Sequence, residues 1–338
     1  MRAVIIERGD ADKILKRLFA QKVIDKTHKI ISDSSHIYAP LAADRTVPGL
    51  EIVDIDFPER RIIESPIKPI IPEMLKLGIP AGEIPRKWVK LGDCAIINYS
   101  GNDETDVGFL FANALRVRTI YALTGRIEGK MRKPSLKILY GPGGDITHLE
   151  NGVYFTFDPS RIMFSPGNVN VRTSMRGIDA SGKIVFDMFA GIGYFSIPIA
   201  KYGHPDIIFA SEINPDSFHY LRMNIQNNKV LEKFEIFNRD CRDVLLDRKA
   251  DIVIMGHFDS HDYIGHAILN IRDPGKIIMH HLVKRENIKS YTNNLLEILS
   301  KYGVYGKVLA SERVKSYSPN IWHYQTTFWV SRSPLVSQ

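Results

Sequence analysis

The stretch Val185–Ser196, VFDMFAGIGYFS, decides the fold of the second half of the chain. An apolar run ends in Asp187, and two closely spaced glycines precede a helical run. Glycine lets the backbone turn tightly and come close to a ligand, and the helix that follows offers unpaired N–H groups with positive potential. The stretch predicts a strand, a turn and a helix that hold a ligand, with the candidate binding residues Asp187, Phe189, Ala190, Gly191 and Gly193.

A second acid supports this interpretation. Glu212 stands near the end of the next apolar run, Ile207–Ile213, where a carboxylate can accept both ribose hydroxyls of an adenosine. A dinucleotide site fits less well, because only two of its three glycines can be matched and the acid precedes the glycines. A purely structural turn is the alternative. The joint occurrence of strand, glycines, helix and second acid favours a cofactor that contains adenosine.

From about residue 180 onward, strand-like and helix-like runs alternate, which is typical of a doubly wound parallel sheet. The last two runs have no helix between them and indicate an antiparallel hairpin at the sheet edge. We therefore expect an α/β, Rossmann-like domain over residues 176–338. Its strands are Lys183–Met188, Ile207–Ile213, Phe234–Asn238, Asp251–Met255, Lys276–His280, Gly306–Val314 and Trp322–Ser331, and its helices include Asp216–Asn227 and Asn287–Tyr302.

Two smaller α+β domains are expected before it. Residues 1–62 contain a helical run, Asp10–Lys22, and short strands, and a proline-rich stretch follows them. Residues 66–175 contain a strand pair over Lys87–Ile97, a helix over Thr105–Arg116 and short antiparallel strands later.

Composition narrows the class of protein without deciding it. Among 338 residues, 45 Lys and Arg exceed 38 Asp and Glu, which gives a net charge of +7. This excess fits a polyanionic partner such as nucleic acid, although many basic proteins bind none. Cys94 and Cys241 have neither CxxC nor zinc spacing, so we expect no metal and no disulfide, in a reducing cytoplasm. No apolar stretch is long enough for a membrane span, and the N-terminus lacks a signal peptide.

Polar residues also follow the third and fourth strands, whose carboxyl ends face the ligand in this fold. Asn238 or Asp240 could hydrogen-bond an adenine amino group, and a helix cap is the alternative for Asp240. His257 follows the fourth strand, where it could donate or accept a proton near neutral pH. A solvated loop histidine is the alternative.

Two segments could contact nucleic acid. A basic loop could neutralise phosphates, and a solvated charged loop is the equally plausible alternative. Near the end, Lys315–Tyr324 combines basic and aromatic residues that could stack on an unpaired base, unless Trp322 simply packs in the core. The candidate contact residues are Arg126, Lys130, Arg132, Lys133, Lys315 and Trp322.

Several short motifs between Ile67 and Val330 occur together in one known family of proteins. The most specific are Pro85–Asp93, Arg132–Pro134, Ile162–Pro166 with Asn168–Val169, Val185–Gly193, Ile254–Gly256 and Trp322–His323. With these motifs the chain resembles the archaeal tRNA wybutosine-synthesising aminocarboxypropyltransferases. That family is related to the tRNA guanine-N1 methyltransferases that act beside the anticodon, which share the Phe-Ser-Pro and Asp-Met-Phe-Ala-Gly pieces.

The resemblance implies a reaction. The 3-amino-3-carboxypropyl group of S-adenosylmethionine would pass to carbon 7 of 4-demethylwyosine, next to the anticodon of phenylalanine tRNA, and methylthioadenosine would leave. Ser165 and Arg172 would hold the amino-acid arm of the cofactor, Glu212 the ribose, and Asn238 or Asp240 the adenine. The partner would be tRNA, and we expect a cytoplasmic monomer without a metal.

The resemblance leaves alternatives open. Related base-modifying methyltransferases carry an Asn-Pro-Pro-aromatic or Asn-Leu-Pro motif where this chain has Gly256 and His257, a difference that favours transfer of the longer arm. Residues 1–62 look like the extra N-terminal domain of the guanine-N1 methyltransferases, which contacts tRNA, so a methyltransferase stays possible. The third possibility, a tRNA-binding protein with a vestigial cofactor site, is disfavoured by the intact Asp187, Gly191, Gly193 and Glu212.

Overall fold

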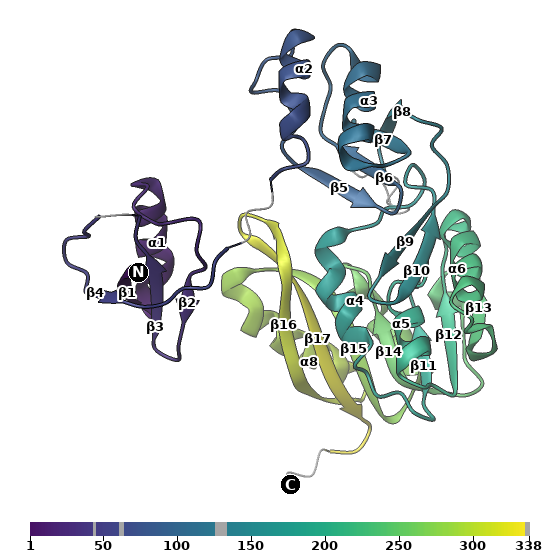
Figure 1. Ribbon diagram of the computed structural model, residues 1–338. Helices are drawn as coiled ribbons and strands as arrows, with labels where there is room; N and C mark the ends of the chain where they lie inside the picture. Colours follow the sequence, from purple (N-terminus) through teal and green to yellow (C-terminus); the bar gives the residue numbers. More distant parts are fainter. Residues whose placement is uncertain (43–44, 61–63, 126–133, 335–338) are drawn as a thin grey trace. The chain divides into compact units, whose positions relative to one another are not determined.

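The structure is a computed structural model that describes residues 1–338 except 43–44, 61–63, 126–133 and 335–338. The chain divides into two compact units, Met1–Lys68 and Pro69–Gln338 (Figure 1). The predicted basic loop with Arg126, Lys130, Arg132 and Lys133 lies outside the described residues. The predicted division of the larger unit near residue 176 stays a prediction.

The unit Met1–Lys68 is a small α+β fold. Its four-stranded antiparallel sheet has the order β2-β3-β1-β4. Val4 and Ile6 of the central strand pack with Leu18 of the helix, and this apolar contact closes a core of its own. Its elements are β1 (Arg2–Glu7), α1 (Ala11–Ala20), β2 (Ile31–Ser32), β3 (His36–Pro40) and β4 (Ile52–Asp54).

The larger unit begins with a four-stranded mixed sheet of order β5-β6-β7-β8. The expected strand pair forms across the turn at Gly92 and Asp93. Helix α3 is rich in small and apolar residues and packs on β7 and β8. The elements are α2 (Ile71–Lys76), β5 (Trp88–Leu91), β6 (Cys94–Ile97), α3 (Glu104–Leu115), β7 (Thr119–Leu123) and β8 (Leu136–Tyr140).

A separate hairpin, β9 (Ile146–Glu150) and β10 (Val153–Phe157), follows this sheet. The buried side chain of Asn224 accepts a hydrogen bond of 2.6 Å from the Thr156 N–H, and that of Asn228 accepts one of 3.0 Å from the Tyr154 N–H. These bonds tie the hairpin to helix α6 (Pro215–Asn227) of the Rossmann-like sheet. The hairpin is therefore held against helix α6.

The main sheet has seven strands in the order β13-β12-β11-β14-β15-β17-β16. The first five are parallel, and β16 and β17 form the expected antiparallel hairpin at the edge. The strand order reverses between β11 and β14, which is where ligands bind in open α/β sheets. The strands are β11 (Ile184–Asp187), β12 (Ile207–Ser211), β13 (Phe234–Phe237), β14 (Ala250–Met255), β15 (Ile271–Lys284), β16 (Tyr305–Ser318) and β17 (Ile321–Ser331).

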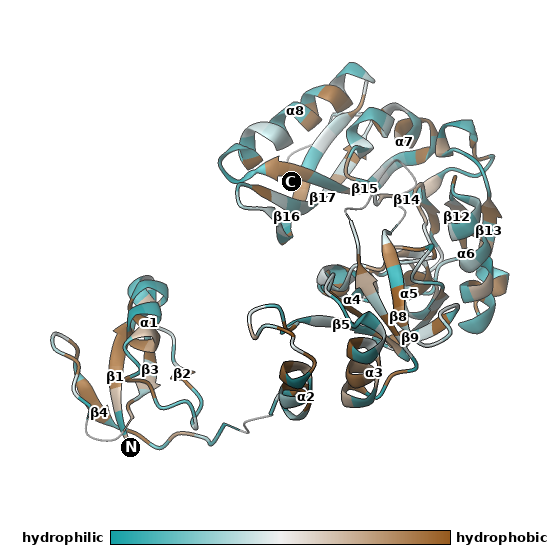
Figure 2. Ribbon diagram, turned by 90° about the horizontal axis from the view of Figure 1, so that it is seen from above, coloured by the Kyte–Doolittle hydropathy of each residue, from teal (hydrophilic) through white to brown (hydrophobic). Residues whose placement is uncertain are grey.

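Helices cover both faces of this sheet. Val185 points into a core shared with α5 and α6, whereas its neighbours Ile184 and Phe186 point into a second core with α7 and α8. Figure 2 shows hydrophilic residues interspersed with hydrophobic ones on α6 and α8, as expected for helices with one buried side. The remaining helices are α4 (Val169–Met175), α5 (Ser196–Tyr202), α7 (Ile264–Asn270) and α8 (Ile288–Lys301). The predicted α/β, Rossmann-like fold is confirmed.

Three further features of the described residues concern membrane spans, metal sites and the two cysteines. Of the helices within the described ranges, none is long and apolar enough to cross a membrane. Among the same residues no group of three His, Cys, Asp or Glu side chains could hold a metal ion. Cys94 and Cys241 are buried and free, without a disulfide.

Candidate cofactor and acceptor site

The glycine turn after β11 has the geometry that its sequence predicts. Gly191 and Gly193 have φ values of +58° and +93°, in the left-handed region that favours glycine. A Cβ atom at Gly191 would lie 2.7 Å from the Tyr194 ring, and one at Gly193 would lie 2.3 Å from Ile197 Cδ1. Both positions therefore require glycine.

Asp187 ends β11 beneath this turn and is fully buried. Its Oδ1 accepts a hydrogen bond of 3.3 Å from the Phe189 N–H, and hydrogen bonds from the hydroxyl and the N–H of Ser196 also favour its ionised form. Burial raises the pKa of the carboxyl to about 7, and the charge of Glu212 adds to the rise. Asp187 is therefore held by donors of its own chain at the start of the glycine turn.

The Glu212 side chain connects the segments that follow β11 and β12. Its Oε2 accepts a 2.7 Å hydrogen bond from the Gly191 N–H, and its Oε1 accepts one of 2.7 Å from the Asn214 N–H. Burial raises the pKa of this carboxyl as well. Each carboxylate oxygen can accept a second hydrogen bond, so the position is compatible with the predicted contact to ribose hydroxyls.

Asn238 and Asp240 follow β13, as expected. The Asn238 side chain donates to the Glu212 carbonyl at 2.8 Å, which places it beside the predicted ribose site. Asp240 accepts from the Arg242 N–H at 2.9 Å and pairs with the Arg242 guanidinium at 2.7 Å. It thus caps the short helix Cys241–Asp243, the alternative that the sequence left open. An adenine contact by either residue stays a prediction.

His257, the candidate catalytic residue, is brought to the glycine turn. Its ring stacks on Phe189 with centroids 5.5 Å apart, and its Nδ1 accepts a 3.2 Å hydrogen bond from the Asp259 N–H. The neutral ring therefore carries its hydrogen on Nε2. The preceding Gly256 leaves room for Phe195, because a Cβ there would lie 2.8 Å from the Phe195 ring.

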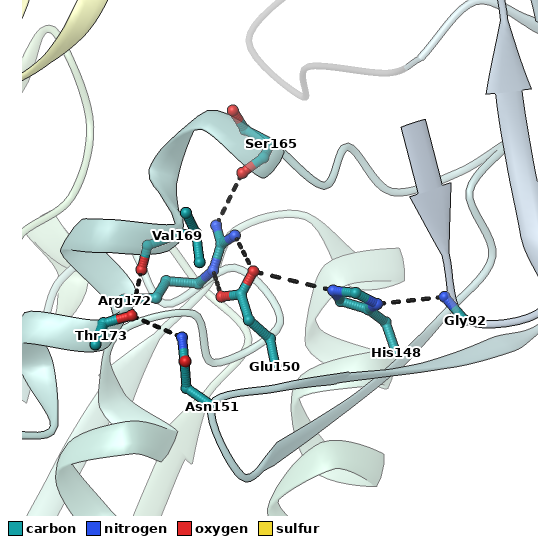
Figure 3. A network of polar contacts seen from close by, with 8 residues as sticks. All are labelled: Gly92, His148, Glu150, Asn151, Ser165, Val169, Arg172 and Thr173. Atoms are coloured by element: carbon teal, nitrogen blue, oxygen red, sulfur yellow. Dashed lines mark hydrogen bonds and ion pairs between the residues drawn. The ribbon is translucent and has the colours of Figure 1, made fainter. Parts of the chain in front are cut away.

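Arg172 has a partner that the sequence did not reveal. Its Nε and Nη2 donate to Oε1 and Oε2 of Glu150 at 2.5 and 2.8 Å, and its Nη1 donates to the Ser165 carbonyl at 3.0 Å (Figure 3). The guanidinium also lies 4.3 Å from the centroid of the Phe164 ring. Only 3% of the Arg172 surface is exposed. In this structure the guanidinium fork is occupied by Glu150, and a contact of Arg172 with a cofactor carboxylate stays a prediction.

The ion pair extends toward the strand pair β5–β6. Although burial opposes its ionisation, the hydrogen bonds from Arg172 and the nearby His148 hold the pKa of Glu150 at about 2. His148 lies 3.9 Å from Glu150 and accepts a 3.2 Å hydrogen bond from the Gly92 N–H (Figure 3). A chain of polar contacts thus runs from the Ser165 segment to the turn that contains Gly92.

Ser165 and Lys315, which the sequence assigned to different ligands, are in contact. Lys315 Nζ donates to Ser165 Oγ at 2.7 Å, which ties β16 to the segment before α4. Trp322 is half-buried, with the guanidinium groups of Arg313 and Arg285 over its ring at 4.0 and 5.1 Å from the centroid. Contacts of Trp322 and Lys315 with tRNA stay predictions.

Sequence reasoning missed two features. Glu150 ends an ordinary strand and carried no motif, so only its contacts reveal it. His280 and His323 are both buried and share a hydrogen bond of 2.8 Å, and the His280 ring stacks on Phe195. Burial lowers the pKa of His280 well below its usual range, so this ring is neutral. A histidine in the middle of each of two apolar strands was the available signal.

Comparison with known proteins agrees with this geometry. The TRM5/TYW2 methyltransferase domain family matches residues 146–305, and the TYW2 N-terminal domain family matches residues 71–144. The tRNA(Phe) (4-demethylwyosine(37)-C(7)) aminocarboxypropyltransferase of Pyrococcus horikoshii is 35% identical over 270 residues, which cover 76% of this chain and 95% of that protein. The tRNA (guanine(37)-N(1))-methyltransferase Trm5b of Pyrococcus abyssi is 27% identical and covers 97% of this chain and 99% of its own length.

Solved structures give the same relationships. TYW2 of P. horikoshii in complex with MeSAdo superposes with a TM-score of 0.70 at 31% identity, over 79% of this chain and all of that one. Trm5b of P. abyssi superposes with a TM-score of 0.68 at 27% identity, over 98% of this chain and 99% of that one. The chain therefore belongs to the TRM5/TYW2 family, in the group of tRNA wybutosine-synthesising aminocarboxypropyltransferases.

Proposed function

We propose that this protein transfers the 3-amino-3-carboxypropyl group of S-adenosylmethionine to carbon 7 of 4-demethylwyosine next to the anticodon of phenylalanine tRNA. The observation that carries the proposal is the 35% identity to an aminocarboxypropyltransferase over 95% of that protein's length. The acceptor loop at Gly256 and His257, which lacks the Asn and Pro of base-modifying methyltransferases, supports it.

In this reaction the protein mainly has to orient two reactants. Carbon 7 forms a bond to the γ-carbon of the donor, the carbon–sulfur bond breaks with its electron pair going to sulfur, and the proton on carbon 7 leaves. Glu212 supplies a partly buried carboxylate at the strand ends, and the two glycines let the donor lie close to the backbone. The orientation of the bound donor decides which carbon of the sulfonium faces the base.

His257 has a defined task in this scheme. Its ring stacks on Phe189 and its Nδ1 accepts a hydrogen bond from the Asp259 N–H, so the side chain is held in one position beside the glycine turn. It would position the acceptor base by contact with its ring.

A second candidate, tRNA guanine-N1 methyltransferase at the same nucleotide, is favoured by one observation. Trm5b of P. abyssi matches 97% of this chain, N-terminal unit included, whereas the aminocarboxypropyltransferase of P. horikoshii matches 76%. The small product separates the two reactions: methylthioadenosine for arm transfer and S-adenosylhomocysteine for methylation.

The test follows from that difference. Purified protein is incubated with S-adenosylmethionine and with phenylalanine tRNA that carries either 4-demethylwyosine or guanine beside the anticodon, and the small product is identified by mass spectrometry. We expect methylthioadenosine, formed only with the modified tRNA. S-adenosylhomocysteine from the guanine tRNA would replace the proposal with the methyltransferase.

The proposal also includes the tRNA partner, the oligomeric state and the cellular compartment. The partner is phenylalanine tRNA, contacted at its anticodon region, and a cytoplasmic monomer stays the prediction from the sequence. Unpaired, buried cysteines are compatible with a reducing compartment.

A further inference from the structure

We infer that Arg285 and Arg313 form a binding site for a phosphodiester group of the substrate tRNA, and that Trp322 positions both arginines without stacking on a base. The inference rests on the proposed function and names the part of the substrate that this surface meets. For Trp322 it replaces the predicted contact with an unpaired base by a supporting role.

These residues lie at the edge of the main sheet where the donor is expected. β14 ends at Met255, which pairs with Met279, whereas β15 continues from there to Lys284 (Figure 1). β17 runs antiparallel to this extension and places Trp322 opposite Val283. At about 3.3 Å per residue, the extension reaches roughly 16 Å beyond the end of β14. The glycine turn also follows the carboxyl end of a parallel strand, β11, so the extension borders the side on which ligands bind.

The Trp322 ring is the outer member of a row of stacked rings. Trp322 stacks on Tyr324 with centroids 6.3 Å apart, and Tyr324 stacks on His281 at 6.1 Å. His281 stacks in turn on Tyr291 of α8 at 4.6 Å. The fully buried His281 also shares a hydrogen bond of 2.8 Å with the hydroxyl of Thr326. The row is therefore anchored in the core and holds the half-buried Trp322 ring in place.

Two guanidinium groups lie over this ring. Those of Arg313 and Arg285 are 4.0 and 5.1 Å from its centroid, and both arginines are exposed. Glu286 and Glu312, their neighbours in the sequence, form no ion pair with either arginine. Each contact with the ring is weak at an exposed site, and two cations beside one ring repel each other. An anion bound by both would remove that repulsion.

The chemistry of the pair favours a phosphate as this anion. A guanidinium carries five N–H donors in a fixed plane, which fits two phosphate oxygens at once. tRNA, the partner in the proposed function, presents phosphodiester groups along its whole length. Exposed cations that bind such groups fix the position of the nucleic acid and do not read its sequence. The two arginines thus add affinity and orientation for the acceptor.

Neutral variants of the two arginines test the phosphate site. In Arg285→Gln and in Arg313→Gln we expect the affinity for unmodified phenylalanine tRNA to fall on the order of tenfold at low salt. The slope of the logarithm of affinity against the logarithm of salt concentration should decrease by about one in each variant, because one phosphate contact is lost. Affinity for S-adenosylmethionine, measured by calorimetry, should stay within about twofold. Lys307→Gln removes an exposed charge near the other end of β16 and should change neither affinity.

A double-mutant cycle tests the role of Trp322. Trp322→Leu should weaken tRNA binding when both arginines are present. In the Arg285→Gln/Arg313→Gln background the same substitution should weaken it by less than about twofold, because the ring then has no guanidinium to position. Trp322→Phe keeps an aromatic face and should keep most of the affinity. Thermal unfolding of each variant separates a loss of binding from a loss of folding.

Other outcomes would overturn the inference. Salt slopes equal to that of the wild type in both arginine variants would mean that neither arginine meets a phosphate. Equal weakening by Trp322→Leu in both backgrounds would mean that the ring itself contacts a base. These measurements need neither donor nor modified base, so they give the same answer whichever group the enzyme transfers. Absence of methylthioadenosine in the product assay would remove the proposed function alone.

Discussion

At the residue scale, the Glu150–Arg172 pair is the most buried ion pair among the described residues, with side-chain exposures of 11% and 3%. Removing one partner of such a pair leaves the other charge uncompensated away from water. We expect Glu150→Gln to lower the free energy of unfolding by on the order of 3 kcal/mol. Urea denaturation measures the change. Because Arg172 would also lose its hold on Ser165, affinity for S-adenosylmethionine should fall as well.

An exposed ion pair supplies the matched control for that variant. Asp216 pairs with Arg161 at the surface, with side-chain exposures of 40% and 47%. Solvent screens such a pair, so Asp216→Asn should cost less than about 1 kcal/mol. If both substitutions lowered the free energy of unfolding by the same amount, burial would not make the loss of Glu150 more costly than the loss of an exposed partner.

The raised pKa of Asp187 predicts how the stability of the protein depends on pH. Burial raises its pKa from 3.8 to about 7, so the folded protein binds more protons than the unfolded chain between these values, and the ionised group destabilises the fold at higher pH. Asp187→Asn, which cannot ionise, should be more stable than wild type at pH 8. The difference should shrink by up to about 1.4 kcal/mol per pH unit as the pH falls from 7 to 4. A pH-independent difference would contradict this account.

At the element scale, Asn224 of α6 connects two elements that are distant in sequence. Its Oδ1 accepts from the Thr156 N–H of β10, and its Nδ2 donates to the Ile192 carbonyl in the glycine turn at 3.1 Å. Asn224→Ala leaves two buried backbone groups without partners, so we expect a loss of about 1–3 kcal/mol and weaker cofactor binding. Gln226→Ala, on the exposed side of the same helix, should change neither.

The sequence predicts an element well when the interactions that form it join residues close together in the chain. Strand β11, the glycine turn and the β16–β17 hairpin were predictable, because apolar runs and glycine spacing act over a few residues. For the region after Arg116 the sequence predicted only short antiparallel strands, and it did not show that β8 pairs with β7 while β9 and β10 form a separate hairpin. The partner of Arg172 and the contact of Lys315 with Ser165 were not predictable, because each joins side chains that only the tertiary fold brings together.

At the scale of the whole molecule, the two units differ in which candidate residues they contain. All candidate cofactor residues lie in Pro69–Gln338, and Met1–Lys68 has a core of its own. The aminocarboxypropyltransferase of P. horikoshii matches only 76% of this chain, whereas Trm5b also matches the first unit. The first unit is therefore expected to add tRNA affinity and to leave donor binding alone.

Removal of Met1–Lys68 tests that expectation. Calorimetry should give an affinity for S-adenosylmethionine within about twofold of the full chain, because no donor contact is lost. Affinity for tRNA should fall, and its logarithm should decline less steeply with the logarithm of salt concentration, because fewer phosphates are neutralised. An unchanged salt slope would mean that the first unit makes no phosphate contacts. Weaker donor binding would mean that the larger unit depends on the first for its donor site, and the separation of roles argued from the two cores would be wrong.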